Sequence, residues 1–251
     1  MARCEFATGK PTCNLNTYVI IPTYNEADNL TQLVGEILVL PIAVGVINVD
    51  DNSPDGTGNL ADALAAQHPG RVLAVHRSAK LGLGTAYLAG FERAFDLQAD
   101  CVMTMDADFS HHPRYIPAMV EKSAAADMII GSRYVAGGGT SRVPFHRRML
   151  SRWANITARL VTGVKARDAT AGFRLYRREV LESIDLERIF SSGYSFLIEM
   201  AYLVQQRGWR IVEVPIVFED RREGTTKISR QEIFSALYTV ARLGSRRIRG
   251  R

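Results

Sequence analysis

The chain has 251 residues, of which 47% are hydrophobic and 23% are charged, with 20 glycines and 9 prolines. This composition is that of a soluble globular protein and excludes a disordered or fibrous chain, and the length suits one domain with room for a C-terminal extension. The formal net charge of +5 favours an anionic partner, such as a nucleotide, a nucleic acid or an acidic membrane surface.

The N-terminal residues 1–16 contain no apolar segment of the kind found in signal peptides, and we expect them to form a tail. The longest apolar stretch, ILVLPIAVGVINV, is interrupted by Pro41 and Gly45 and is shorter than the roughly 20 residues that span a bilayer. The three cysteines lack metal-ligand spacing. We therefore expect a chain without a membrane-spanning helix, in the reducing cytoplasm.

Short apolar runs alternate with helical patterns through the first half of the chain. The patterns predict strands at 17–22, 44–50, 72–76, 101–105 and 127–133, and helices at 26–40, 60–68, 85–95 and 114–126. Strands that are mostly apolar and alternate with helices are typical of a parallel sheet covered by helices on both faces. We therefore predict an α/β fold with a Rossmann-like, mostly parallel sheet.

Polar clusters follow three of these strands at the point where each strand ends. PTYNE follows the first strand, DDNSPDGT follows the second, and DADFSHHP follows the strand at 101–105. Ligands of parallel sheets bind beyond the carboxyl ends of the strands. The three acidic loops are therefore expected to converge on one crevice.

The third of these loops carries Asp106 and Asp108, one residue apart. Two carboxylates at this spacing on a turn can hold Mg²⁺ or Mn²⁺, which in turn bridges the phosphates of a nucleotide. Two alternatives stay open: a solvated turn without a ligand, and an acid/base pair as in glycoside hydrolases, which leaves the other acidic loops unexplained. His111 and His112 have no cysteine partner at zinc-ligand spacing, so His111 is interpreted as structural support for the loop.

The other two loops suit a nucleoside. The carboxylates of DDNSPDGT and of Glu26 can accept hydrogen bonds from a ribose or a base, and the ring of Tyr24 can pack on the base. KLGLGTAY, at 80–87, looks like a phosphate-binding loop, but it lacks the Walker ending and the dinucleotide glycine spacing. Its glycines are interpreted as allowing a close turn into a helix.

The second half of the chain predicts two amphipathic helices. The first, FHRRMLSRWANITARLVTG, is rich in arginine and has an apolar stripe formed by Met149, Leu150, Trp153, Ile156, Leu160 and Val161. It is interpreted either as a basic helix on a membrane surface or as a core helix with a solvated basic face. The second begins with a capping box at 229–232 and ends in a basic tail.

The chain resembles the polyprenol (dolichol) monophosphate mannose synthases of the inverting glycosyltransferase family 2. Nine motifs carry the resemblance, in this order: PTYNE, DDNSPDGT, KLGLGTAY, MDADFSHHP, GSRY, SRWAN, DATAGFRLYRREVL, EVPIVFEDR and TTK. The match runs from about Tyr18 to Lys227 and implies a GT-A glycosyltransferase domain at 17–228. The tail at 1–16 would precede this domain, and an amphipathic helix with a basic tail at 229–251 would follow it.

The resemblance implies transfer of mannose from GDP-mannose to a polyprenyl phosphate with inversion, and Mg²⁺ or Mn²⁺ as cofactor. A related transferase that uses UDP-glucose or another nucleotide sugar stays open. A polyprenyl phosphate is already anionic near neutral pH, so it can attack the sugar without the base that a hydroxyl acceptor requires. The protein then supplies positioning and charge.

The resemblance also assigns roles to individual residues. The nucleotide pocket falls on Pro22, Tyr24, Glu26, Val49 and Asp51. The metal and diphosphate site falls on Asp106, Ala107 and Asp108, with Ser110 as a further metal ligand where some members have Gln.

Arginines make up much of the remaining site. Arg133, Arg147 and Ser151 are assigned to the lipid phosphate, and Arg133 also to the nucleotide sugar. Arg221 and Lys227 belong to a loop that closes over the donor. Asp106, Asp108 and Arg133 are the candidates for direct participation in catalysis.

The helix around 147–161 and the tail RLGSRRIRGR place arginines beside apolar residues. They predict peripheral binding to the cytoplasmic face of a membrane, and recruitment by a separate membrane-anchoring protein is compatible with it. A nucleic-acid partner is not expected, because the conspicuous loops are acidic and no recognised nucleic-acid-binding module occurs.

Overall fold

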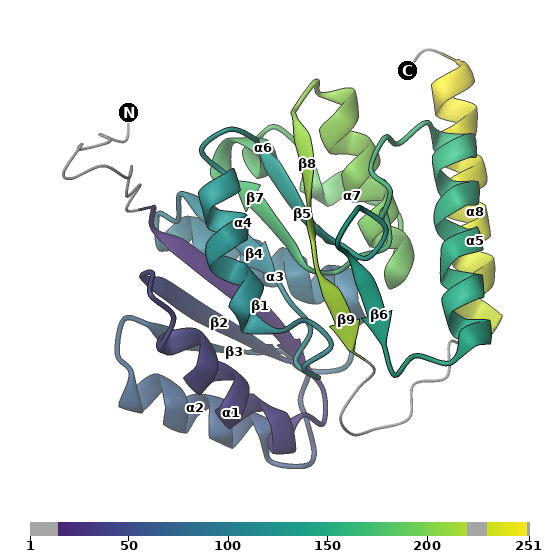
Figure 1. The fold of residues 1–251 in the computed structure, drawn as a ribbon. Coiled ribbons are helices and arrows are strands. Elements are labelled where there is room, and N and C mark those ends of the chain that lie inside the picture. The colour runs from purple at the N-terminus through teal and green to yellow at the C-terminus, as the bar shows by residue number, and fades with distance from the viewer. Residues whose placement is uncertain (1–14, 220–229, 250–251) are drawn as a thin grey trace.

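The protein is built around a twisted sheet, seen in a computed structural model that describes residues 15–219 and 230–249 (Figure 1). The sheet has seven strands in the order β3-β2-β1-β4-β7-β5-β8. Their bounds are β1 (Thr17–Thr23), β2 (Val44–Asp50), β3 (Val72–His76), β4 (Cys101–Thr104), β5 (Met128–Ser132), β7 (Arg174–Arg177) and β8 (Ile211–Pro215). Only β7 runs antiparallel to its neighbours in this sheet, so the predicted mostly parallel sheet is confirmed.

Helices cover both faces of the sheet, as predicted (Figure 1). Their bounds are α1 (Ala27–Leu38), α2 (Thr57–Gln67), α3 (Leu83–Asp96), α4 (Ile116–Lys122), α5 (Phe145–Thr162), α6 (Arg178–Glu182), α7 (Tyr194–Gln206) and α8 (Arg230–Ile248). Short 3₁₀ turns occur at Pro113–Tyr115 and Leu186–Arg188. A small parallel pair, β6 (Gly139–Ser141) with β9 (Val217–Glu219), lies beside the main sheet.

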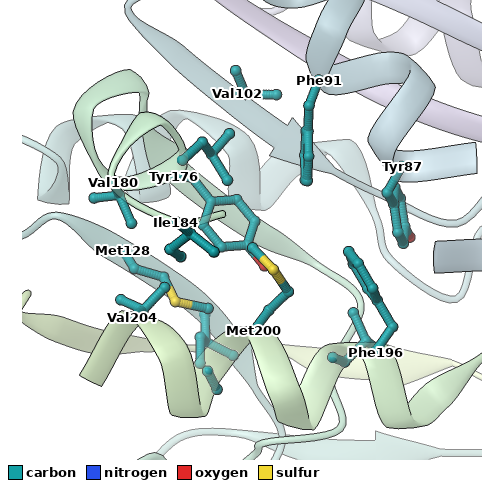
Figure 2. Close-up of a cluster of buried hydrophobic side chains, with 14 of the residues drawn as sticks. Tyr87, Phe91, Val102, Met128, Tyr176, Val180, Ile184, Phe196, Met200 and Val204 are labelled. Atoms are coloured by element: carbon teal, nitrogen blue, oxygen red, sulfur yellow. The ribbon is translucent and has the colours of Figure 1, made fainter. Parts of the chain in front are cut away.

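Two hydrophobic cores form because successive side chains of a strand point to opposite faces of the sheet. Val19 and Ile21 of β1 pack with α1, α2 and α4 on one face. Tyr18 and Ile20 pack on the other face with α3, α6 and α7, where Figure 2 shows the aromatic and aliphatic side chains meeting. Continuous apolar strands such as β2, in which every residue is buried, follow from this two-sided burial.

The sheet register brings the three predicted loops together. β1 pairs with β2 on one side, where Thr23 lies opposite Asp50, and with β4 on the other, where Ile20 lies opposite Thr104. The carboxyl ends of β2, β1 and β4 are therefore neighbours at one edge of the sheet. The predicted convergence of the acidic loops is confirmed.

Some element bounds differ from the prediction. Helix α2 begins three residues early, at Thr57, whose amide and hydroxyl donate hydrogen bonds to the Asp55 carboxylate. Helix α4 ends at Lys122, where the Ser123 hydroxyl bonds the Val120 carbonyl. Strand β7 was not predicted, because its four residues, RLYR, are polar at both ends.

Helix α5 does not bury its apolar stripe, so its interpretation as a core helix is wrong. The stripe stays exposed: Met149 37%, Leu150 50%, Trp153 61%, Ile156 38%, Leu160 74% and Val161 40%. The buried residues of α5 are instead the small or polar Asn155, Ala158 and Thr162. Helix α8 runs beside α5 and also packs against α7 (Figure 1).

Among the described residues, no helix combines the length and the apolar character that crossing a membrane demands. The predicted boundary between 228 and 229 and the side chains of the capping box lie outside the described residues. The division of the chain into tail, transferase domain and C-terminal segment therefore stays a prediction.

The contact between α3 and β1 generates a test of the fold. Gly90 of α3 is buried, and an added Cβ would overlap the Ile20 side chain. Gly90→Ala is expected to lower the free energy of unfolding by about 1–3 kcal/mol, because it overpacks the core. Gly35→Ala in α1 is the control: nothing lies within 4 Å of its added Cβ, so better helix propensity should raise stability by up to about 1 kcal/mol. Urea denaturation followed by circular dichroism measures both, and equal stabilities of Gly90→Ala and wild type would contradict the packing.

Candidate active site

The candidate site lies at the carboxyl ends of β2, β1 and β4. Each of its three loops turns through a residue in the left-handed region, namely Asn25, Asn52 and Phe109, with φ of 60°, 58° and 60°. Asparagine tolerates this conformation, but a buried phenylalanine there is unusual. Such strain, of about 1–3 kcal/mol, persists only where the surroundings impose it and is concentrated at functional sites.

The first two loops are bonded to each other. The Asp51 amide donates to the Thr23 carbonyl at 3.0 Å, and the Glu26 amide donates to the Thr57 hydroxyl at 3.0 Å. Asp50 is buried, and its carboxylate accepts hydrogen bonds from the hydroxyls of Thr23 and Ser53. Asp50 therefore holds the two loops together from within the protein, and Asp55 adds a second link by accepting the Ala27 amide at 3.1 Å.

Asp51 is the carboxylate of this group that pairs with an arginine. Its Oδ1 lies 2.7 Å from Arg77 Nη1, and Arg77 Nη2 donates to Thr85 Oγ1 at 2.7 Å. Both charged side chains are almost buried, at 8% and 9% exposure. Burial raises the pKa of Asp51, and the positive charge of Arg77 opposes that rise. The Asp51–Arg77 pair therefore forms a buried wall on one side of the predicted nucleotide pocket.

The other predicted pocket residues lie around this wall. Val49 is buried, Pro22 is half-buried at the end of β1, and Tyr24 is exposed with Lys80 Nζ 3.9 Å from its ring centroid. The Glu26 carboxylate accepts a hydrogen bond from the side chain of Asn29 at 2.9 Å. An exposed aromatic ring beside a cation suits stacking against a base.

Asp106 and Asp108 differ in exposure and in the contacts of their carboxylates. The Asp106 side chain is 28% exposed, and its Oδ1 accepts a hydrogen bond from the Tyr87 hydroxyl at 3.3 Å. Asp108 is buried, and its Oδ1 accepts the Ser110 amide at 3.0 Å. Burial and the negative charge of Asp106 raise the pKa of Tyr87 well above its ordinary value, so the phenol stays protonated as a donor.

His111 contacts the Asp106–Asp108 loop from the interior of the protein. Its Nδ1 accepts the Asp106 amide at 3.4 Å and lies 3.7 Å from Asp106 Oδ2. The ring is buried, stacked on Phe173 at 5.3 Å and edge-on to Phe218 at 5.5 Å. These contacts fit the interpretation of His111 as structural support.

The oxygen atoms of this loop suit a divalent cation. Ser110 Oγ is buried and has no hydrogen-bond partner in the part of the chain that the structure describes. That hydroxyl and the two carboxylates are hard oxygen donors, which Mg²⁺ and Mn²⁺ prefer. No group of three or more His, Cys, Asp or Glu side chains gathers among the described residues as a complete metal cage would. Few protein ligands are usual for Mg²⁺, which also binds substrate phosphates.

Arg133, after β5, forms a bidentate ion pair that the sequence reasoning missed. Its Nε and Nη2 bond the two carboxylate oxygens of Asp168 at 2.8 and 2.7 Å, and Nη2 also bonds Thr170 Oγ1 at 3.0 Å. Burial works to lower the pKa of Arg133, but the charge and hydrogen bonds of Asp168 outweigh it and raise this pKa. Among the described residues, Asp168 and Thr170 accept hydrogen bonds from Nε and Nη2.

A hollow of about 440 Å³ separates this arginine from α5. Basic and apolar side chains line it together, among them Arg133, Arg148, Arg152, Tyr134, Phe145 and Met149. The family resemblance assigned Arg147 and Ser151 of α5 to the lipid phosphate together with Arg133, and the Ser151 hydroxyl accepts a hydrogen bond from the Tyr134 hydroxyl at 2.8 Å. Arg148 and Arg152 are four residues apart and so share a helix face, but Arg147 and Ser151 have the same spacing, so the sequence did not single out the pair that lines the hollow.

The structure thus gathers Asp106, Ala107, Asp108 and Ser110 in one loop beside the nucleotide-pocket residues. It places Arg133 and α5 around the separate hollow. Arg221 and Lys227 lie outside the described residues, so their assignment to a closing loop stays a prediction.

Comparison with known proteins identifies a family and relatives that agree with one another. A family model described as glycosyl transferase family 2 matches residues 18–185. Polyprenol monophosphomannose synthase of Mycolicibacterium smegmatis is 46% identical over 246 residues, covering 98% of this chain and 91% of that protein. Undecaprenyl-phosphate mannosyltransferase of Micrococcus luteus is 41% identical over 230 residues, covering 92% and 94%.

Solved structures of glucosyl-3-phosphoglycerate synthase from Mycobacterium tuberculosis share the fold. One, with Mn²⁺, UDP and glucosyl-3-phosphoglycerate, has a TM-score of 0.64 at 20% identity, covering 90% of this chain and 80% of that one. Another, with Mg²⁺ and UDP, has a TM-score of 0.64 at 19% identity, covering 90% and 79%. With the family match, this likeness confirms the predicted GT-A type of fold.

The Arg133–Asp168 pair generates a test of the site's electrostatics. Asp168→Ala leaves a nearly buried guanidinium without its counter-ion, so the free energy of unfolding should fall by about 3–5 kcal/mol. Asp185→Ala removes a similar carboxylate, 2.9 Å from Arg188, from a pair exposed at 50% and 86%. That control should cost less than about 1 kcal/mol. Chemical denaturation measures both, and equal costs for the two variants would disprove the compensating role of Asp168.

Proposed function

Because the chain belongs to glycosyl transferase family 2, it is a glycosyltransferase, and we propose that it transfers mannose from GDP-mannose to a polyprenyl phosphate. The product is a polyprenyl-phosphate mannose with an inverted anomeric carbon. The names of the two relatives support both the sugar and the lipid class of acceptor. The second candidate is a transfer from UDP-glucose, because the fold neighbours are described with UDP.

The observation that carries the proposal is the arrangement of acidic loops on one side and arginines on the other. Strand β4 ends at the Asp106–Ala107–Asp108 loop and lies between β1 and β7 in the sheet. This loop therefore has the pocket residues around Asp51 on one side. On its other side is the segment before β7 that contains Asp168, the partner of Arg133. A nucleotide diphosphate and an anionic acceptor therefore have separate, chemically suited surfaces. A sugar carbon between them would be exposed to attack on the side away from the diphosphate.

Donor binding rests on the first two loops. The ring of Tyr24 would stack on the base, Pro22 and Val49 would form the floor of the pocket, and Asp51, held by Arg77, would accept donor hydrogens of the nucleoside. When bound at Asp106, Asp108 and Ser110, a Mg²⁺ or Mn²⁺ ion supplies positive charge to the departing diphosphate. The presence of Mn²⁺ or Mg²⁺ in the fold neighbours supports a divalent cation.

Acceptor binding rests on the hollow beside α5. Arg133 would use Nη1 toward the phosphate, since Asp168 and Thr170 occupy its other donors. Arg147 and Ser151 are assigned to the same phosphate by the family resemblance, and Arg148 and Arg152 add positive charge to the hollow. Charge-assisted bonds of this kind hold an anion firmly. No residue is needed as a base, because the acceptor phosphate is already ionised.

We also propose that the enzyme works as a peripheral protein at the cytoplasmic face of a membrane. The exposed stripe of α5 and the exposed Phe234, Leu237 and Tyr238 of α8 lie on two neighbouring helices. Arg148, Arg152 and Arg242 are on the same helices and would approach anionic headgroups. A separate anchoring protein remains a compatible partner.

The proposed reaction predicts that the purified chain moves radiolabelled mannose from GDP-mannose to a polyprenyl phosphate with Mg²⁺ or Mn²⁺ present. Asp108→Asn should slow transfer by about 100-fold or more, because charge stabilisation by a bound metal is worth several kcal/mol. Asp62→Asn is the matched control, since Asp62 is 60% exposed and pairs only with His76 among the described residues. Chromatography of the lipid product measures the rate.

Parallel reactions with UDP-glucose decide between the two donors. Transfer of glucose without mannose would establish the second candidate. If neither sugar reached the lipid, or if Asp108→Asn matched Asp62→Asn, the proposed reaction or its metal site would be rejected.

The membrane proposal predicts binding to vesicles that contain anionic lipid. Trp153→Glu should weaken binding about 10-fold or more, because burial of one large apolar side chain contributes ~1.5–3 kcal/mol. Val39→Glu is the control, since Val39 is 82% exposed but lies after α1, far from α5 in the fold. Co-sedimentation should also fall as salt rises. Binding that is unaffected by Trp153→Glu and by salt would reject the α5 stripe and the arginines as the membrane contact, and a chain that did not bind anionic vesicles even at low salt would require an anchoring partner.

A further inference from the structure

The family resemblance assigns no site residue to the motif KLGLGTAY, at 80–87, yet the structure gives its glycines a specific use. Gly82, with φ of 99°, precedes α3, and Gly84 lies against α7, where an added Cβ would be 2.9 Å from the ring of Phe196. Gly82 lets the chain turn sharply into α3, and Gly84 lets α3 pack closely against α7. The contact fixes the position of the first turns of α3.

Tyr87 follows one turn after Gly84 and is fully buried. Its ring is held between Phe196, at 6.1 Å between centroids, and Phe91, at 6.5 Å (Figure 2). With the ring fixed, the hydroxyl has one position, and there it donates to Asp106 Oδ1 at 3.3 Å. The motif therefore positions the Tyr87 hydroxyl against Asp106, the more exposed carboxylate of the candidate metal site.

Asp106 is constrained from two further sides. His111 Nδ1 accepts its amide and lies 3.7 Å from its Oδ2. The backbone at Gly172 lies on another side, where an added Cβ would make ordinary van der Waals contact with Oδ1 at 3.4 Å. The Tyr87 hydroxyl thus completes a set of contacts around a carboxylate that is partly open to solvent.

We propose that Tyr87 is a positioning residue that orients the Asp106 carboxylate for a divalent cation. This inference rests on the proposed function, in which Asp106 holds that cation. Partners that hydrogen-bond a metal ligand fix its orientation, and their loss typically lowers metal affinity about 10- to 100-fold. The KLGLGTAY motif then belongs to the active site through Tyr87 of α3, in addition to its contacts of Lys80 with Tyr24 and of Thr85 with Arg77.

The same core contains a natural control for a merely structural role. Tyr202 of α7 is also buried, but its hydroxyl has no hydrogen-bond partner within the described chain. Tyr87→Phe and Tyr202→Phe each delete one buried hydroxyl and keep the ring. Only the first of them removes a contact to Asp106.

The experiment titrates Mn²⁺, in the presence of GDP, into the wild type, Tyr87→Phe, Tyr202→Phe and Asp106→Asn, and follows free Mn²⁺ by electron paramagnetic resonance. Tyr87→Phe should raise the dissociation constant of Mn²⁺ about 10-fold or more. Tyr202→Phe should leave it within about 2-fold of wild type, since the described residues offer its hydroxyl no partner. Asp106→Asn should abolish specific binding. Thermal unfolding of each variant shows that the fold is retained.

A second measurement separates positioning from general damage. The Mn²⁺ concentration that gives half the maximal transfer rate should rise in Tyr87→Phe, while the rate at saturating Mn²⁺ returns to within about 3-fold of wild type, because added metal offsets a lost orienting contact. A rate that stays low at every Mn²⁺ concentration would reject the positioning role.

The two proposals fail in different ways. If Asp106→Asn bound Mn²⁺ like the wild type, or the wild type bound none, the proposed metal site and the role of Tyr87 would both fall. If Asp106→Asn lost binding while Tyr87→Phe matched Tyr202→Phe, the role of Tyr87 alone would be wrong.

Discussion

Parallel pairing of β1 with both β2 and β4 is the constraint on which the rest of the structure depends. A parallel neighbour ends at the same edge of the sheet, so this pairing gathers three loops that are far apart in the sequence. The loops are then bonded to one another, through Asp50 and through the amides of Asp51 and Glu26. A shift of β1 by one residue would exchange its two buried faces. The core therefore holds the register, and the register holds the candidate site.

The site edge contains several buried charges, and each is compensated locally. Asp51 pairs with Arg77, and Arg133 pairs with Asp168. Arg174 of β7 is fully buried and donates instead to backbone carbonyls on the 168–172 loop and α7. An unpaired charge in these positions would be costly. The pairs therefore fix the loops at this edge of the sheet.

The sequence was sufficient for the first half of the fold and for the place of the site, because apolar strands and the strand-end rule depend on local pattern. It was insufficient where a partner lies far along the chain. The Arg133–Asp168 pair spans 35 residues, and no pattern near either residue encodes it. Periodicity likewise showed that α5 is amphipathic but not whether another element covers its stripe. The orienting contact of Tyr87 with Asp106 also depends on how α3 packs against α7, which a motif alone does not specify.

Helix α5 connects the proposed membrane surface to the proposed acceptor site. On its inner side, the side chain of Asn155 donates from Nδ2 to the Thr170 hydroxyl at 2.8 Å. Its Oδ1 accepts the Thr170 backbone amide at 3.2 Å. The Thr170 hydroxyl also accepts Arg133 Nη2, and Tyr134, next along the chain, donates to Ser151 of the same helix. A displacement of α5 would therefore disturb the partners of Arg133. The fold would therefore fix the position of the Arg133 guanidinium relative to the bilayer surface at which a lipid phosphate is held. Because this position is fixed before binding, less entropy would be lost when the acceptor is aligned with the donor.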